Sequence, residues 1–393
     1  MTTRRKKSTR ELAGAGFFAC LVAAGMIQQA LAQTDTPPNG PGEISVVLVG
    51  QALIKKDLRT LTPAAVEQAR DYIGQADVAF TNLEVALAQG DSGQDKGPGE
   101  LVPPPPSVLD CLRDMGFNLL SLANNHAVDQ GTEGIEYTRK AAASRGFALA
   151  GTGNNLAEAL SPGELNTPAG KVALVAMASG AKQLTQDTWA TPEQAGVNFL
   201  ELDENGMLNA AQKNRILEAV RQAAQESSLV IAYQHNHYWG ESHDIAGPPG
   251  REPRVDRFST PAWMESWARE LIDAGASIYV AHGNPALHGI EIYKEKLILY
   301  GLGNYIFHST GTPDKFGPLA YYSAVINARF VSGLVKSIQI EPLVLALDEP
   351  ARGAPFLATG GEAHAILGRL KDLSQAYGTE IQIHGDLAEI VLK

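Results

Sequence analysis

Runs of apolar, often β-branched residues alternate along the chain with segments whose apolar positions recur every three or four residues. The apolar runs predict strands at 44–49, 77–81, 117–122, 147–150, 171–178, 229–234 and 277–282. The helical spacing predicts helices at 63–73, 107–115, 132–145, 206–226 and 260–274. Later patterns predict a hairpin from Gly289 to Ile306 that turns at 294–296, and strands at 321–330 and 334–345. This order of elements favours a mixed α/β sandwich over a doubly wound sheet.

The pattern shows no internal repeat and no linker that would separate a second folded domain. We predict one domain at 44–349, followed by an extension at 350–393 that contributes a helix and two short strands to the same body. A polar segment rich in Pro and Gly at 33–43 is predicted to be a linker. A chain of 393 residues is long enough to bury a sizeable core.

The first 32 residues differ in charge from the rest of the chain. They hold five basic residues and one acid, then an apolar stretch from Leu12 to Ile27 and the small-residue exit Ala30-Leu31-Ala32. This pattern is typical of a secretory signal peptide, so we expect an exported protein that is periplasmic or extracellular. The alternative interpretation is an N-terminal membrane anchor, and peripheral association with the membrane is compatible with either.

The overall composition excludes a disordered chain and argues against one class of binding partner. Hydrophobic residues make up 44% of the chain, which excludes disorder as the main state. The formal net charge of -11 argues against nucleic acid as a principal partner, because binding to phosphates is driven by clustered Lys and Arg.

Polar side chains stand where several predicted strands end, which is where α/β sheets gather their ligands. They are Glu84, Asn125, His126, His235, His237 and His282. Imidazole is the commonest metal ligand and titrates nearest neutral pH. His235 and His237 are two residues apart, so in an extended backbone both rings point to one side. They are predicted to supply two ligands to one metal, or one ligand and one acid-base group.

Each of these residues also has a purely structural interpretation. Glu84 is a metal ligand, a base, or a carboxylate at the start of a helix, and Asn125 is a ligand or part of an Asx turn. Either histidine of the 235/237 pair is a hydrogen-bonded core residue in this alternative. Asp129 is predicted to cap the following helix.

Four segments together resemble a known family. They are Asp77-Val-Ala-Phe-Thr-Asn-Leu-Glu84, Ser121-Leu-Ala-Asn-Asn-His-Ala-Val-Asp129, Gly289-Ile-Glu-Ile-Tyr-Lys294 and Tyr300-Gly-Leu-Gly-Asn304. The chain resembles the poly-γ-glutamate capsule synthesis (CapA-type) proteins, which are relatives of the calcineurin-like metallophosphoesterases. The resemblance covers roughly residues 44–310. It implies a four-layer αββα sandwich with a site at the strand ends and a pair of divalent metals.

We therefore assign expected roles to nine residues of this sequence. The expected metal ligands are Glu84, Asn125, His235 and His282. The expected acid-base residues are His126 and His237, and the expected substrate contacts are Gln51, Asn82 and Asn304.

Two departures from the family pattern weaken the expectation that two metal ions are bound. Gln51 stands where the family usually has an Asp, and Pro285 stands where it often has a second histidine three residues after His282. An amide cannot bridge two cations as a carboxylate does. We therefore expect a single Mn, Fe or Zn ion, or none.

The function expected from these observations is an exported hydrolase or transferase of capsule or poly-γ-glutamate-type polymer synthesis or processing. Its partners would be an acidic polymer or a small-molecule substrate, and an envelope synthesis complex. The alternatives are a non-catalytic polymer-binding or scaffold protein, which the altered ligand set favours, and a metal-independent acid-base enzyme that uses Glu84, His126 and His237.

Overall fold

The structure is a computed structural model that describes residues 42–89, 102–181, 183–203, 205–239, 258–309 and 316–393. The predicted signal peptide at 1–32 and nearly all of the predicted linker at 33–43 lie outside the described residues. Everything below concerns the unit formed by residues 38–393.

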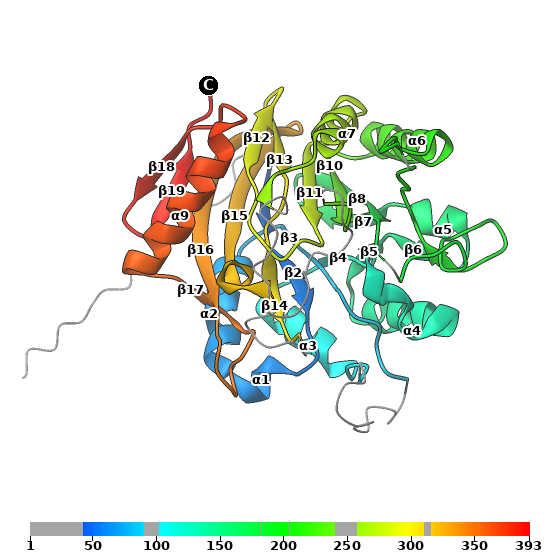
Figure 1. Cartoon of the computed structure of the whole chain (residues 1–393), viewed down its shortest axis with the longest axis horizontal. Helices are drawn as coiled ribbons and strands as arrows, with labels where there is room; N and C mark the ends of the chain where they lie inside the picture. Colours follow the sequence, from blue (N-terminus) through cyan, green and yellow to red (C-terminus); the bar gives the residue numbers. More distant parts are fainter. Residues whose placement is uncertain (1–41, 90–101, 182, 204, 240–257, 310–315) are drawn as a thin grey trace, which may run out of the picture. The chain divides into compact units, whose positions relative to one another are not determined.

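Among the described residues, nine strands form a first sheet: β1 Glu43–Leu48, β3 Val78–Asn82, β4 Leu119–Ser121, β5 Ala148–Ala150, β15 Tyr322–Val331, β16 Leu334–Leu345, β17 Pro355–Leu357, β18 Ile381–His384 and β19 Leu387–Ile390. The order is β18-β19-β16-β15-β1-β3-β4-β5, with β17 beside β16. β1, β3, β4 and β5 are parallel, and the other pairs are antiparallel. The C-terminal strands β18 and β19 therefore belong to the same sheet as the first strand, β1 (Figure 1).

A second sheet holds six described strands: β7 Gly163–Thr167, β8 Gly170–Ser179, β10 Leu229–Asn236, β11 Ile278–His282, β12 Ile290–Tyr293 and β13 Lys296–Leu299. Its order is β12-β13-β11-β10-β8-β7. The four central strands are parallel, and the edge strands β7 and β12 are antiparallel to their neighbours. Two short pairs complete the strands: parallel β2 Gln51–Leu53 with β14 Asn304–Phe307, and antiparallel β6 Thr152–Gly153 with β9 Gly196–Val197.

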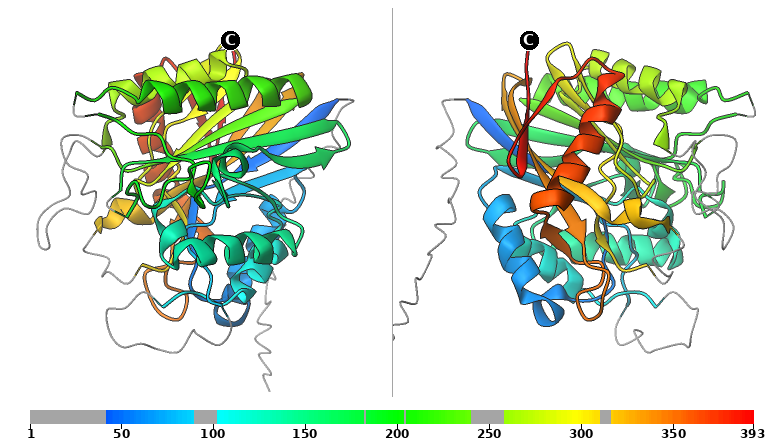
Figure 2. Two further views of the ribbon diagram at one scale, coloured as in Figure 1. Left: turned by 90° about the vertical axis from the view of Figure 1, so that its right-hand side faces the viewer. Right: turned by 60° about the vertical axis from the view of Figure 1, so that its left-hand side comes forward.

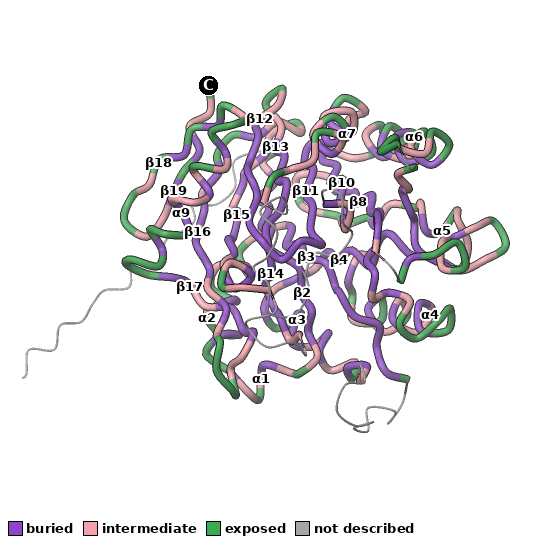
Figure 3. The backbone as a smooth tube through the Cα atoms, viewed as in Figure 1, coloured by how far each residue is buried: buried purple, intermediate pink, exposed green. Residues whose placement is uncertain are grey.

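The α-helices are α1 Leu58–Leu61, α2 Pro63–Ile73, α3 Ser107–Met115, α4 Gly131–Ala143, α5 Leu156–Leu160, α6 Ala210–Glu226, α7 Ala262–Asp273 and α9 Gly360–Gln375. Short 3-10 helices are η1 Asn125–Val128 and η3 Pro318–Tyr321. Figure 2 shows helices on both outer sides and strands between them. The strands are buried along most of their length, while exposed residues gather on the helices and loops (Figure 3).

Three hydrophobic clusters separate four layers. α2 and α3 pack on the outer face of the first sheet, and α6 and α7 pack on the outer face of the second. Between the sheets lies a core to which both contribute. Side chains alternate between the two faces along each strand. Val46 and Leu48 of β1 therefore pack in the core between the sheets, while Val47 packs against the helices. The predicted αββα sandwich is confirmed.

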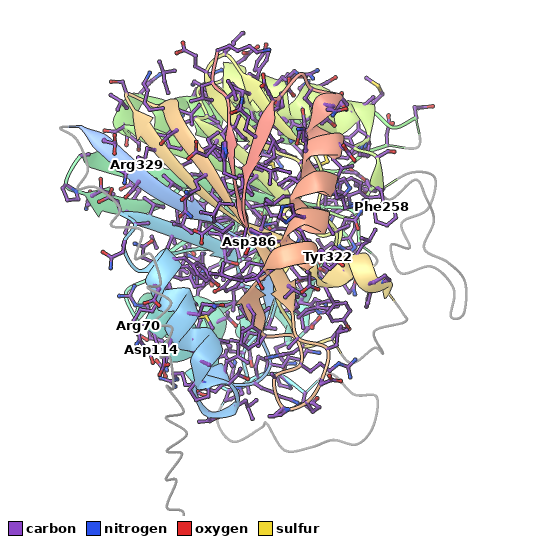
Figure 4. The ribbon with its side chains drawn as sticks, turned by 90° about the vertical axis from the view of Figure 1, so that its left-hand side faces the viewer. Arg70, Asp114, Phe258, Tyr322, Arg329 and Asp386 are labelled. Atoms are coloured by element: carbon purple, nitrogen blue, oxygen red, sulfur yellow. The ribbon has the colours of Figure 1, made fainter. Side chains whose placement is uncertain are left out.

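The C-terminal helix α9 closes one side of the core between the sheets, where it packs against β16, β18 and β12. The turn between β18 and β19 holds its first residue, because Asp386 Oδ1 accepts a hydrogen bond of 2.9 Å from the backbone N–H of Gly360 (Figure 4). On the opposite sheet face, Arg70 of α2 donates to the carbonyl of Asp114, 3.1 Å away, at the end of α3.

Two predicted boundaries are corrected by local capping. The helix predicted from 206 begins at Ala210, because the side chain of Asn209 accepts a hydrogen bond from the backbone of Gln212 and so caps it. Asp129 does not cap the next helix. The N-cap of α4 is Gln130, whose side chain makes no capping bond.

The hairpin predicted from Gly289 is only partly as expected. β12 and β13 are joined through Lys294 and Glu295, both with positive φ, as a tight two-residue turn requires. The chain then leaves the hairpin, and β14 pairs in parallel with β2 instead. A pattern of buried residues does not reveal this distant partner, since β2 lies some 250 positions earlier in the chain.

Gln51 ties this strand pair to the loop that follows β11. Its Oε1 accepts a hydrogen bond of 2.9 Å from the backbone N–H of Gly283, and its Nε2 donates to Asn304 Oδ1, 3.1 Å away. The amide of Asn304 in turn donates to the carbonyl of Ala320. Gly283 has φ of +106°, and an added Cβ would meet the backbone of Asn236, so only glycine presents its N–H in this way. We call these three residues the Gln51 clamp: Gln51, Gly283 and Asn304.

His308 secures the segment that follows β2. Its Nδ1 accepts hydrogen bonds from the backbone N–H groups of Lys55, at 3.0 Å, and Lys56, at 3.2 Å. An acceptor nitrogen cannot carry a proton, and burial lowers the pKa of His308 to about 4, helped by the charges of Lys56 and Lys55. This loop is therefore held by a neutral imidazole.

Protonation of His308 is expected to destabilise the fold in acid. The unfolded chain takes up the proton near the ordinary pKa of 6.5, whereas the folded chain resists it down to about 4. Stability is therefore complete above pH 6.5 and falls by up to about 3 kcal/mol as the pH drops through this interval. Urea unfolding at several pH values should show a shallower acid decline for His308→Asn, which keeps an acceptor that does not titrate. An unchanged slope for His308→Asn would contradict the assignment.

The Gln51 clamp is expected to contribute strongly to stability. Gln51→Met has a similar shape but leaves the N–H of Gly283 and Oδ1 of Asn304 buried without this partner, so the free energy of unfolding should fall by about 3 kcal/mol. Gln375→Met, at the exposed end of α9, should change it by less than about 0.5 kcal/mol. Equal denaturation midpoints for the two variants would refute the clamp.

Candidate functional site

The predicted site residues come together where the parallel strands of both sheets end. Glu84 follows β3, and Asn125 lies in η1 just after β4. His235 and His282 are register partners on the neighbouring strands β10 and β11. Their side chains share the face of Tyr233 and Val280, which belongs to the core between the sheets. The two sheets therefore present their polar strand ends to one another.

His235 is the centre of this group. Its Nε2 lies 2.8 Å from Asn125 Oδ1 and 3.0 Å from His237 Nε2. Oε1 of Glu84 is 3.9 Å from the same nitrogen. The contact with Asn125 joins residues 110 positions apart, one from each sheet. We call this set the His235 cluster: Glu84, Asn125, His235 and His237.

Burial controls the charge of the cluster. Desolvation lowers the pKa of His235 far below its usual range, and the neighbouring histidines lower it further. It also lowers the pKa of His282 to about 3, although the backbone of Val49 opposes the shift. Both imidazoles are thus neutral, the form that binds metals. The ring of His282 stacks on Phe80.

Glu84 is buried next to these imidazoles. Desolvation raises its pKa to about 7, while the charge of His126 opposes the shift. Its second carboxylate oxygen, Oε2, is buried and has no hydrogen-bond partner among the described residues. A buried carboxylate oxygen of this kind is expected to acquire a cation or a hydrogen-bond donor.

Asp129 orients His126 instead of capping a helix. His126 Nδ1 lies 2.7 Å from Asp129 Oδ2, so Asp129 engages this nitrogen and not Nε2. Burial opposes the charged form of His126, but the hydrogen bond to Asp129 and the field of Glu84 outweigh it and raise its pKa. The raised pKa favours the charged imidazolium, in which both ring nitrogens carry a proton.

The three expected substrate contacts are all buried. Gln51 and Asn304 belong to the Gln51 clamp described above. Asn82 accepts a hydrogen bond of 3.0 Å from Asn124, whose own Oδ1 accepts from the backbone of His126. These amides therefore position the loops that carry the site, and their role as substrate contacts stays a prediction.

A small cleft opens beside Glu84 and His126. Its lining also includes Lys55, Asp129, Gln130 and the prolines Pro103 and Pro104. Lys55 was not among the residues expected from sequence, because it follows a three-residue strand without any motif. The sequence signals that could have pointed to Lys55 are the nearby Gln51 and the change from apolar to basic residues at Lys55 and Lys56.

The donor set can be compared with what a metal requires. In the part of the chain that the structure describes, no group of three or more His, Cys, Asp and Glu side chains has the geometry to hold an ion. Glu84, His235 and His237 of the His235 cluster are three such side chains, and with Glu84 Oε1 3.9 Å from His235 Nε2 they do not form such a group. Ligand atoms about 2.1 Å from one cation and at right angles lie about 3.0 Å apart. The separations of His235 Nε2 from Asn125 Oδ1 and His237 Nε2, 2.8 and 3.0 Å, match this spacing, whereas the 3.9 Å to Glu84 Oε1 is longer.

Comparisons with known proteins agree with the resemblance drawn from the motifs. Residues 45–309 match the model of the family described as bacterial capsule synthesis protein PGA_cap. The chain is 27% identical over 442 aligned positions to the uncharacterized protein y4sH of Sinorhizobium fredii (strain NBRC 101917 / NGR234), covering 88% of this chain and 93% of that protein. It is 24% identical over 340 positions to the capsule biosynthesis protein CapA of Bacillus anthracis, covering 84% and 76%.

A solved structure of a hypothetical protein from Thermus thermophilus aligns with a TM-score of 0.44 and 14% identity, over 76% of this chain and 98% of that one. The family model spans most of the sandwich and all four motifs, which confirms the resemblance. The chain belongs to the bacterial capsule synthesis protein (PGA_cap) family.

Proposed function

We propose that this protein is a divalent-metal-dependent hydrolase or transferase that acts on an acidic polymer during capsule or poly-γ-glutamate-type synthesis. The relative from Bacillus anthracis is named a capsule biosynthesis protein, which supports the biological setting. The observation that carries the chemistry is the His235 cluster: a carboxylate, an amide oxygen and two imidazoles converge at the strand ends beside an oriented histidine.

The residues proposed to hold the cation are those of the His235 cluster, with His282 on the adjacent strand. Asn125, His235 and His237 supply donors at ligand spacing, and Glu84 supplies the negative charge. His237, expected from sequence to be an acid-base group, is better placed as a ligand. The amide of Gln51 is occupied by Gly283 and Asn304, which favours one ion over two.

The chemistry is divided between the cation and His126. A divalent cation here would polarise the scissile bond and favour ionisation of an attacking water. His126 gives a proton from Nε2 to the leaving oxygen or nitrogen as its bond to the substrate breaks, while Asp129 holds the ring. The core between the sheets keeps bulk water from the far side of the cluster.

The setting of the reaction belongs to the same proposal. The leader at 1–32 supports an exported protein of the periplasm or the cell exterior that works with an envelope synthesis complex. The helices that the structure describes include none that is both long and apolar enough to cross a membrane.

A non-catalytic polymer-binding or scaffold role is the second candidate. It is favoured by the Gln51 clamp, where the family usually has a carboxylate, and by the absence of a His, Cys, Asp and Glu metal group among the described residues. Metal content separates the two candidates.

The purified chain is expected to bind about one Mn, Fe or Zn ion, measured by elemental analysis after dialysis. His235→Ala should lose at least about 90% of this metal because it removes the central donor. His384→Ala, exposed on β18, should retain it. A wild-type chain that binds no ion even when metal is added would favour the scaffold role, and two ions per chain would contradict the single site.

His126→Ala is expected to lower the turnover number by about 100-fold to 10,000-fold, because it removes the proposed proton donor. Shortening of γ-linked polyglutamate and cleavage of chromogenic phosphodiesters would be measured in parallel. Thermal unfolding and metal content should stay near wild type, since His126 lies outside the His235 cluster. Wild-type turnover in this variant would eliminate the role.

A further inference from the structure

Lys55 is a cation beside the site, and neither the motifs nor the family comparison assigns it a role. It follows β2 and lines the cleft together with Glu84, His126 and Asp129. Of the residues that line this cleft in the described structure, Lys55 is the one Lys or Arg. The cleft would otherwise present two carboxylates to an entering ligand.

The ammonium of Lys55 is not committed to a carboxylate. Among the described residues it forms no ion pair, although the charges of Asp129 and Glu84 act on it from nearby. Burial lowers its pKa, a sign that it is partly withdrawn from water. Lys56, the next residue, points elsewhere and is exposed, with its Nζ 3.4 Å from Glu349.

The backbone around Lys55 is fixed more firmly than an ordinary surface loop. The Nδ1 of His308 accepts from the N–H of Lys55, and the N–H of His308 donates to the carbonyl of Leu53. The pairing of β2 with β14 anchors the same segment to the Gln51 clamp. The cation is thus presented to the cleft by a preorganised loop, which reduces the entropy lost when a ligand binds.

We propose that Lys55 binds an anionic oxygen group of the substrate, a carboxylate or a phosphoryl group, in the cleft beside His126. The ammonium donates to the oxygen and offsets the repulsion of Glu84 and Asp129. This places the charged group of the substrate next to the proton donor. The inference rests on the proposed function for its substrate class, whereas anion binding at Lys55 is measured without turnover.

The test is calorimetric titration of the full chain with two probes, inorganic phosphate and a tetramer of γ-linked glutamate. Lys55→Met should weaken binding of the preferred probe by at least about tenfold, because a charge-assisted hydrogen bond is lost. Lys55→Arg keeps the charge and should stay within about threefold of wild type. Lys56→Met is the matched control and should bind within about twofold of wild type.

The outcomes distinguish this inference from the proposed function. Preference for phosphate or for the glutamate tetramer identifies the source of the anion. Equal affinities of wild type and Lys55→Met, or no binding of either probe by the wild type, overturn the inference. Lys55→Gln is the second variant if Lys55→Met does not fold, judged by thermal unfolding. A chain that shows no turnover but loses anion binding in Lys55→Met would refute the enzyme and retain the anion site.

Discussion

The contact between Asn125 and His235 is the interaction on which the site depends. It joins the end of one sheet to the end of the other, over 2.8 Å and 110 positions of sequence. Neither strand end is a site alone: one offers a carboxylate and an amide, the other offers imidazoles. They meet because the apolar faces of the two sheets are packed together, and that packing fixes the distance between the edges.

The same packing sets the chemistry of the polar groups. Withdrawing Glu84 from water raises its pKa to about 7, and withdrawing His282 lowers its pKa to about 3. Both shifts move the groups toward their neutral forms, so the buried cluster carries less charge than its residue types suggest. A bound cation would reverse the shift of Glu84, because an adjacent positive charge favours the carboxylate.

On the cleft side, the carboxylates Glu84 and Asp129 would repel an anionic ligand. Under the proposed function, an acidic polymer would approach Glu84 and Asp129, whose charges would repel it unless a cation stood nearby. Lys55 lines the same cleft, on the loop that His308 and β14 secure. The Gln51 clamp holds the start of β2, the strand that precedes the same loop. A few buried amides therefore support the segment that carries Lys55.

The sequence by itself determined the strands, the long helices and the polar residues at the strand ends, because burial repeats with the period of each element and leaves a local record. It also established the family, since the motifs are contiguous. Only the tertiary structure decided that Asp129 orients His126, that β14 pairs with β2, and that His235 meets Asn125. The position of Lys55 in the cleft beside Glu84 and His126 was also revealed only by the fold. These features depend on which distant segments meet, and that is set by the packing of two sheets, which no local pattern records.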